Sequence, residues 1–266
     1  MRMGRAAVTL ALPAMLVLGS CSNSSRSSSD TTTLTVLGAS SLSTVFPRIG
    51  ALFTKNHPEA AFRWSFGGTD TLAAQIEQGA PADVFAGAST KYGDQLLGEG
   101  LIGSPHAFAT NRLVLIVPPE NPARITSPRD LTKPGLKLVV GAETVPAGSY
   151  TRTVLTNLDA LYGKGYDARV LANVVDNEDA VSGVLQKVQL DEADAGFVYV
   201  TDAAAAGGAV MAIPLPDEAQ ATATYPIAVV KTSAHRVLAA QFASFVLTPA
   251  AQALLSEAKF GPPPAS

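Results

Sequence analysis

The chain alternates between short apolar runs of strand length and longer stretches in which apolar residues recur at helical spacing. Strand-like runs cover residues 34–37, 62–66, 84–86, 113–117, 138–140, 196–200 and 225–230. Helical spacing covers residues 42–53, 72–76, 150–158, 181–188 and 238–245. Repeated passage from strand to helix to strand is the pattern of a parallel sheet with covering helices, so the chain is predicted to be α/β. Pro47 falls inside the first helical stretch, which predicts a late helix start or a kink.

The N-terminal residues have the composition of a secretion signal that ends at a cysteine. Arg2 and Arg5 precede an apolar stretch over residues 6–18, which is too short to span a bilayer stably, and Gly19 and Ser20 lead to Cys21. The pattern predicts a lipoprotein signal peptide over residues 1–20 and acylation of Cys21. The protein is then extracytoplasmic and anchored to the cell membrane. The alternative is a buried cysteine in an ordinary N-terminal helix.

The segment after Cys21 is nearly all Ser, Thr, Asn and Asp up to residue 33, so residues 21–33 are predicted to be a lipidated, flexible tether. Cys21 is the only cysteine, and the folded part therefore has no internal disulfide. Removing the signal takes away two arginines and leaves 17 basic against 22 acidic residues, a formal charge of −5. Nucleic acid is not expected as a partner, because no basic stripe is present to neutralise phosphates.

Four turns share one feature, in that small, hydroxyl or acidic residues lead into a helix. They are residues 38–41 (Gly-Ala-Ser-Ser), 67–71 (Gly-Gly-Thr-Asp-Thr), 145–149 (Val-Pro-Ala-Gly-Ser) and 177–181 (Asn-Glu-Asp-Ala-Val). A helix start has unpaired N–H groups and a partial positive charge, so several starts that meet at one cleft bind an anion without lysine or arginine. Taken singly, Ser41 or Thr69 could be a plain helix cap.

Five segments, in order, resemble the molybdate-binding proteins of bacterial ABC importers. They are residues 39–42 (ASSL), 79–85 (GAPADVF), 145–150 (VPAGSY), 196–199 (GFVY) and 225–230 (YPIAVV), and the resemblance covers nearly all of residues 34–261. It implies the two-lobed periplasmic-binding-protein fold of type II, with the ligand in the cleft between the lobes and two crossover segments. The first lobe is then residues 34–111 and 225–266, and the second lobe is residues 112–224.

The resemblance also implies a ligand site and a physiological role. In that family the oxyanion is held by two hydroxyl residues, two backbone amides and a tyrosine hydroxyl, which correspond here to Ser41, Thr69, Ala147, Val181 and Tyr199. The implied ligand is molybdate or tungstate, with molybdenum bound as the oxyanion and without direct metal ligands. The implied partner is an ABC transporter permease, no cofactor is expected, and the family suggests a monomer.

Asp70 departs from the family, whose second turn commonly carries serines. A carboxylate at about 4 Å from a dianion would be strongly repelled, so Asp70 is expected to point away and cap its helix. If it faced the ligand, it could accept a hydrogen bond from hydrogen phosphate, whose proton molybdate lacks. Phosphate therefore remains an alternative, and so does sulfate, which only cleft size and donor geometry could exclude.

An enzyme is the competing class, and the residues do not favour it. His57, His106 and His235 lie in no metal-ligand pattern, and residues 38–42 lack the second glycine of a hydrolase elbow. The sole cysteine is assigned to the lipid. The chain is therefore predicted to bind its ligand without turnover.

Overall fold

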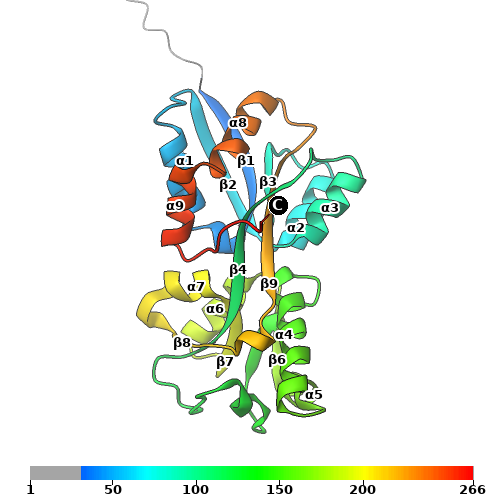
Figure 1. Cartoon of the computed structure of the whole chain (residues 1–266), viewed down its shortest axis with the longest axis vertical. Coiled ribbons are helices and arrows are strands. Elements are labelled where there is room, and N and C mark those ends of the chain that lie inside the picture. The colour runs from blue at the N-terminus through cyan, green and yellow to red at the C-terminus, as the bar shows by residue number, and fades with distance from the viewer. Residues whose placement is uncertain (1–30, 266) are drawn as a thin grey trace, which may run out of the picture. The chain divides into compact units, whose positions relative to one another are not determined.

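The computed structural model describes residues 31–265, in which two long strands, β4 (His106–Val117) and β9 (Thr222–Val229), join two lobes (Figure 1). The other strands are β1 (Thr32–Ala39), β2 (Ala60–Gly67), β3 (Val84–Ala86), β5 (Leu138–Gly141), β6 (Val174–Glu178), β7 (Ala195–Tyr199) and β8 (Met211–Ile213). The α-helices are α1 (Phe46–Phe53), α2 (Thr69–Glu77), α3 (Thr90–Gly98), α4 (Pro146–Tyr162), α5 (Tyr166–Leu171), α6 (Val181–Gln189), α7 (Val200–Ala206), α8 (Arg236–Val246) and α9 (Pro249–Glu257). The short 3₁₀ helices are η1 (Ser40–Leu42), η2 (Pro128–Thr132), η3 (Gly207–Ala209) and η4 (Asp217–Ala219).

The first lobe is built on the strand order β2-β1-β3-β9-β4. Strand β1 pairs in parallel with β2 and β3, whereas β9 is antiparallel to β3 and to β4. Helices α1, α8 and α9 pack together, and α2 packs with α3 and β1. The sheet thus carries helices that bury its apolar residues.

The second lobe continues from β4 through β7 and β5 to β6, with β8 on the other side of β4. Its central strand β5 is parallel to β6 and β7, while β4 is antiparallel to β7 and β8. Helices α4 and α6 contact β5 and β7, and α5 packs on α4. Leu113–Ile116 of β4 pair with β7, and the preceding half of β4 pairs with β9, so one strand belongs to both lobes.

The two-lobed α/β architecture is confirmed, and the parallel sheet expected from the strand–helix–strand pattern is found in part of each lobe. Each lobe is parallel only where strands are linked through helices, as in β1–β3 and β5–β7. The crossing strands run in opposite directions because β4 leaves the first lobe and β9 returns to it. Antiparallel pairing of these two strands follows from that path.

Several boundaries differ from the predicted ones. Strand β1 begins at Thr32, so the predicted tether is two residues too long at its C-terminal end. Helix α1 begins only at Phe46, with Pro47 in its first turn, where proline costs no intrahelical hydrogen bond. Strand β7 ends at Tyr199, because Val200 already belongs to α7. The predicted signal peptide and Cys21 lie outside the described residues.

The buried core runs through both lobes. In the first lobe the rings of Phe46, Phe53 and Phe242 pack edge to face, and Phe62, Trp64 and Phe66 of β2 stack in a row beside them. The crossing strands add Phe108 and Tyr225, which are fully buried, and the Phe108 ring packs on both Phe46 and Tyr225. Such continuous packing fixes the strands that carry the side chains of the site.

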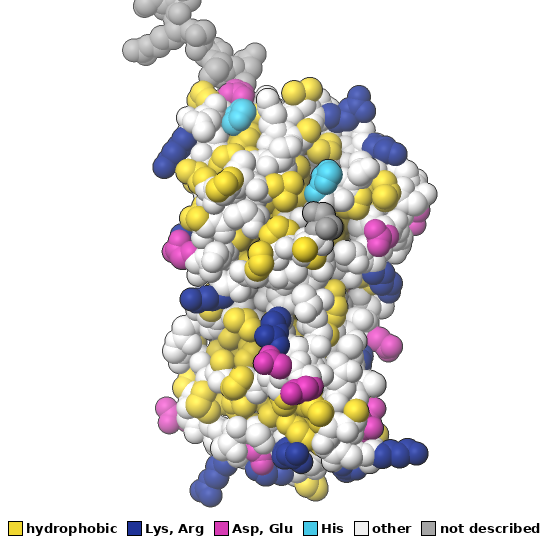
Figure 2. Space-filling view, in the orientation of Figure 1, with side chains coloured by type: hydrophobic (Ala, Val, Ile, Leu, Met, Phe, Trp, Pro, Cys, Tyr) yellow, Lys and Arg dark blue, Asp and Glu magenta, His cyan; other side chains and the backbone are white. Residues whose placement is uncertain are grey.

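Among the helices of residues 31–265, none is by itself long and apolar enough to cross a membrane, and α8 with α9 meet that test only as a pair bent by 60°. On the face drawn in Figure 2, basic and acidic side chains are scattered singly over both lobes.

Candidate functional site

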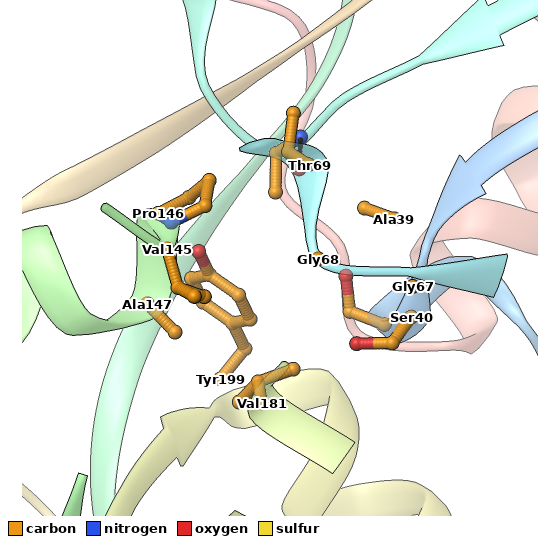
Figure 3. Close-up of a pocket in the computed structure, with 12 residues that line it drawn as sticks. Ala39, Ser40, Gly67, Gly68, Thr69, Val145, Pro146, Ala147, Val181 and Tyr199 are labelled. Carbon is orange, nitrogen blue, oxygen red and sulfur yellow. Dashed lines mark hydrogen bonds between the residues drawn. The ribbon is translucent and has the colours of Figure 1, made fainter. Parts of the chain in front are cut away.

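A pocket with an empty volume of about 200 Å³, part of which opens to solvent, lies between the lobes where the helix starts meet (Figure 3). All five residues predicted to bind the ligand line it: Ser41, Thr69, Ala147, Val181 and Tyr199. The other lining residues are Ala39, Ser40, Gly67, Gly68, Ala88, Val145 and Pro146. None of these side chains carries a charge, so the pocket can attract an anion only through dipoles and hydrogen-bond donors.

The second lobe points backbone amides at the pocket. Val181 is the first residue of α6, after the extended Ala180, and Ala147 follows Pro146 at the start of α4. The N–H groups of a first helical turn have no partner within the helix, so both amides are available to a ligand. Gly148 brings α4 against the end of β5, since a Cβ atom there would lie 2.0 Å from the carbonyl oxygen of Ala142. Only glycine permits that approach.

The first lobe contributes hydroxyl groups that are held by neighbouring groups. The Ser41 hydroxyl, 5 % exposed, lies 2.9 Å from the hydroxyl of Tyr225. The Thr69 hydroxyl accepts a hydrogen bond of 3.0 Å from the Ala88 backbone N–H, which leaves its own proton free to donate. The N-cap positions belong to Ala39 in η1 and Gly68 in α2, so Ser41 and Thr69 are not plain helix caps.

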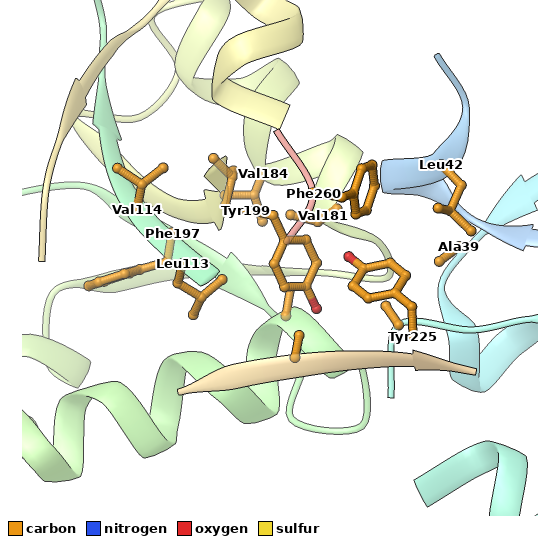
Figure 4. Close-up of a cluster of buried hydrophobic side chains, with 14 of the residues drawn as sticks. Ala39, Leu42, Leu113, Val114, Val181, Val184, Phe197, Tyr199, Tyr225 and Phe260 are labelled. Atoms are coloured by element: carbon orange, nitrogen blue, oxygen red, sulfur yellow. The ribbon is translucent and has the colours of Figure 1, made fainter. Parts of the chain in front are cut away.

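Tyr199 carries a buried hydroxyl that has no hydrogen-bond partner among the described residues. The side chain is 1 % exposed, and its ring packs edge to face on Tyr225 at 5.9 Å between ring centres (Figure 4). Burial, and after it the nearby Tyr225, raises the pKa of the Tyr199 hydroxyl well above its usual value. The group therefore stays protonated, and a buried donor without a partner costs free energy unless a ligand accepts its proton.

Asp202 lies behind Tyr199 in the first turn of α7. Its carboxylate accepts a hydrogen bond of 3.0 Å from the Tyr199 backbone N–H. Burial raises the pKa of Asp202 to about 7, although that hydrogen bond lowers it. Near neutral pH the carboxyl group is thus partly protonated, which reduces the negative charge behind the pocket.

Asp70 does not line the pocket, and in this respect the expectation for it is met. It does not cap α2, however, because its carboxylate accepts a hydrogen bond of 2.8 Å from the Thr144 hydroxyl of the second lobe. The Tyr92 hydroxyl of the first lobe donates to the Thr144 carbonyl oxygen. Burial and, secondarily, Asp70 raise the pKa of Tyr92. We call Asp70, Tyr92 and Thr144 the rim latch, since they join the lobes beside the pocket.

Two parts of the site were not found from the sequence. Ala88, whose N–H holds Thr69, follows β3 in a Gly-Ala-Ser turn of the same small-residue type as the four turns that were singled out. Asn111 and Tyr225 entered the sequence analysis as the residues at which the first lobe was predicted to end and to resume, and residue 225 also as the start of a resembling segment, but neither was assigned a role in the site. Tyr225 bonds to Ser41, and the Asn111 side-chain amide donates to Tyr225 at 3.3 Å.

Neutral donors from two lobes that surround a small pocket define a class of protein, the two-lobed binding protein for a small anion. The chain matches the family described as bacterial extracellular solute-binding protein over residues 34–261, and it belongs to that family. It is 37 % identical over 260 residues to the molybdate-binding protein ModA of Mycobacterium tuberculosis, covering 94 % of this chain and 95 % of the relative.

A second relative is the putative ABC transporter substrate-binding lipoprotein YvgL of Bacillus subtilis, 32 % identical over 89 % of this chain and 90 % of that one. Among solved structures, the periplasmic molybdate-binding protein of Azotobacter vinelandii aligns with a TM-score of 0.72, over 87 % of this chain and all of the other, at 24 % identity. The two-lobed periplasmic-binding-protein fold is thereby confirmed.

Proposed function

We propose that this protein captures molybdate, and tungstate with it, and delivers the ion to the permease of an ABC transporter. The named function of the M. tuberculosis relative supports molybdate as ligand. The proposed contacts are the hydroxyls of Ser41 and Thr69, the amides of Ala147 and Val181, and the hydroxyl of Tyr199. Closure of the lobes replaces the hydration shell of the ion with these donors, and the closed protein docks as a monomer on the permease.

The observation that carries the proposal is the unpartnered hydroxyl of Tyr199 in the pocket. A buried polar group without a partner is rare, and an oxyanion supplies the acceptor it lacks. Every other proposed contact is able to donate a hydrogen bond, which suits a ligand that presents only acceptor oxygens. A site of this kind offers no group for catalysis, and no product is expected from any oxyanion incubated with the pure protein.

Phosphate and sulfate are the alternative ligands. Hydrogen phosphate carries a proton at neutral pH and needs an acceptor, and the nearby carboxylate of Asp70 does not line the pocket. Its Oδ2 accepts a hydrogen bond from Thr144, and its Oδ1 is buried without a partner among the described residues. Sulfate is fully ionised like molybdate, so only the size of the closed pocket separates the two ions. The set of hydrogen-bond donors around the pocket favours molybdate over phosphate. The named function of the M. tuberculosis relative favours molybdate over sulfate.

The deciding experiment compares the melting temperature of a soluble form that begins at Ser22 with molybdate, tungstate, sulfate or phosphate added. A ligand at about 1,000 times its Kd adds about 4 kcal/mol to the stability of the folded state. Stabilisation by molybdate and tungstate supports the proposal. Stabilisation by sulfate or phosphate instead would make that ion the ligand. If none of the four ions raises the melting temperature, the proposed function is overturned.

The lipid anchor is a separate part of the proposal. The sequence before Cys21 and the name of the YvgL relative support it. Replacement of Cys21 by alanine in the full chain is expected to move the protein from the membrane fraction to the soluble fraction. A protein that still sediments with membranes after Cys21→Ala is not anchored through this cysteine.

A further inference from the structure

The Ser41 hydroxyl has one proton, and its position decides what the pocket can bind. The oxygen atoms of Ser41 and Tyr225 lie 2.9 Å apart, and either group could be the donor. If Ser41 donates to Tyr225, it presents only lone pairs to the pocket. If Tyr225 donates to Ser41, the Ser41 proton is free to point at a ligand.

Asn111 settles the direction of this hydrogen bond. Its side-chain oxygen accepts a hydrogen bond of 3.0 Å from the Arg112 backbone N–H, which fixes the other end of the amide as the donor. That nitrogen has two protons, and two acceptors lie within reach: the Thr201 hydroxyl at 2.9 Å and the Tyr225 hydroxyl at 3.3 Å. The Tyr225 oxygen therefore accepts from Asn111.

Among the described residues, Ser41 is the acceptor within hydrogen-bond distance of the Tyr225 hydroxyl, because Asn111 presents a donor to it. If Ser41 also donated to Tyr225, the buried Tyr225 proton would have no partner. The Tyr225 proton is therefore directed to Ser41, and the Ser41 proton to the pocket. Burial raises the pKa of the Tyr225 hydroxyl, so the proton is retained. The three side chains are at most 5 % exposed, which keeps water from competing for these positions. Asn111 and Tyr225 lie on the paired crossing strands β4 and β9, whose backbone is fixed by the register of Asn111 opposite Ala223 and Ala109 opposite Tyr225.

We propose that Asn111 and Tyr225 are positioning residues that hold Ser41 as a hydrogen-bond donor and make the first lobe select ligands that present no proton. The chain of hydrogen bonds runs from the Asn111 amide to Tyr225, from Tyr225 to Ser41, and from Ser41 to the ligand. We call it the Asn111 relay. It rests on the proposed function, since it requires an oxyanion in this pocket.

A double-mutant cycle tests whether Tyr225 acts through Ser41. Molybdate affinity is measured by calorimetry for the soluble wild-type protein, Ser41→Ala, Tyr225→Phe and the double variant. Ser41→Ala is expected to weaken binding about 10- to 150-fold, the range for a hydrogen bond to a charged group. Tyr225→Phe is expected to weaken it about 2- to 12-fold, as for a neutral hydrogen bond. In the Ser41→Ala background, Tyr225→Phe is expected to have almost no effect.

The selectivity for molybdate over phosphate distinguishes the relay from a merely structural role of Tyr225, because a structural role would not change it. Without the Tyr225 proton, the Ser41 hydroxyl can rotate and accept a hydrogen bond from hydrogen phosphate. The ratio of molybdate affinity to phosphate affinity is therefore expected to fall in Tyr225→Phe. Tyr166→Phe is the matched control, because Tyr166 is also buried and its hydroxyl donates to the Pro128 carbonyl far along the second lobe. It is expected to leave both affinities unchanged.

A second variant, Asn111→Asp, keeps the acceptor for Arg112 and replaces the donor with an acceptor. Tyr225 then donates to the new carboxylate and Ser41 donates to Tyr225, so Ser41 presents only lone pairs to the pocket. The loss of molybdate affinity caused by Asn111→Asp is measured in the wild-type protein and in Ser41→Ala. The loss seen in Ser41→Ala is due to the added charge. The additional loss seen in the wild-type protein is due to the relay. Additive effects in both cycles, or an unchanged selectivity ratio, would overturn the inference. A wild-type protein that binds no oxyanion would overturn the proposed function instead.

Discussion

The two lobes offer donors of different kinds to the same pocket. The first lobe offers the side-chain hydroxyls of Ser41 and Thr69, and the second offers the backbone amides of Ala147 and Val181 together with the Tyr199 hydroxyl. A hydroxyl can donate or accept, so Tyr225 and Ala88 are needed to orient the first pair. An amide can only donate, and its helix orients it. The first lobe is therefore the part of the site whose selectivity depends on a supporting network.

The largest effect is expected from a charge placed in the first lobe. Ser41→Asp puts a carboxylate against the anion, and two unit charges 4 Å apart repel by about 4 kcal/mol at an effective dielectric constant of 20. Against a dianion the affinity for molybdate is expected to fall more than about a thousandfold by calorimetry. Ser41→Asn, which adds similar bulk without the charge, is the control and should retain measurable binding. Equal losses in the two variants would mean that bulk, rather than charge, excludes the ion.

The backbone donors of the second lobe can be removed only by proline. Val181→Pro deletes the amide proton at the first position of α6, where proline is tolerated, and the preceding Ala180 already has the extended backbone that proline requires. Affinity is expected to fall about 150-fold or more, since the ring also occupies the place of the proton. Val181→Ala loses more of the side chain but keeps the N–H, and should bind within a few-fold of wild type. Weak binding by Val181→Ala would assign the effect to packing.

Among the described residues, Tyr199 is the side-chain donor that the second lobe presents to the pocket, and its hydroxyl has no partner in the protein to lose. Tyr199→Phe is expected to weaken molybdate binding by about 1.5–3 kcal/mol, or about 10- to 150-fold. The melting temperature of the ligand-free protein should not fall, because no hydrogen bond among the described residues is broken. Calorimetry and thermal unfolding on the same samples check both statements. Unchanged affinity would remove Tyr199 from the site.

Sequence patterns predicted those features of the two lobes that depend on neighbouring residues in the chain, namely the helix starts around the pocket. Small and hydroxyl residues between a strand and a helix mark the helix starts, and each of the four turns precedes or contains such a start. The resemblance selected Tyr199, which a pattern alone leaves as an ordinary residue at a strand end. Four α-helices were missed: α3, α5, α7 and α9. Helix α3 contains two glycines and few apolar residues, α5 has only six residues, and α7 is largely a run of alanines without periodicity.

The supporting network could not be predicted, because its members are far apart along the chain. Ser41 and Tyr225 are separated by 184 residues, and Asn111 and Tyr225 by 114. The direction of β4 and β9, which brings them together, leaves no mark in hydrophobic periodicity. Asp70 shows the same limit, since helix chemistry predicted a cap and the nearby second lobe offered a better partner in Thr144.

The smallest effect is expected at the rim latch, where the lobes meet without touching the ligand. Thr144→Val removes the hydrogen bond to Asp70 and keeps the Thr144 carbonyl that Tyr92 contacts. Gly68 shows how closely the lobes approach here, because a Cβ atom on it would lie 2.2 Å from the Asp179 carbonyl oxygen. The latch joins the two lobes, so we expect its loss to lower affinity by making closure of the lobes less favourable. We expect a loss of affinity of about 2- to 10-fold, seen mainly as faster release of the ion in stopped-flow measurements.

The control is Thr126→Val, which removes a similar exposed hydrogen bond, to Asp130 at 3.1 Å within the second lobe. It should change neither the affinity nor the rate of release. If Thr144→Val also leaves release unchanged, the donors inside the pocket alone hold the lobes together.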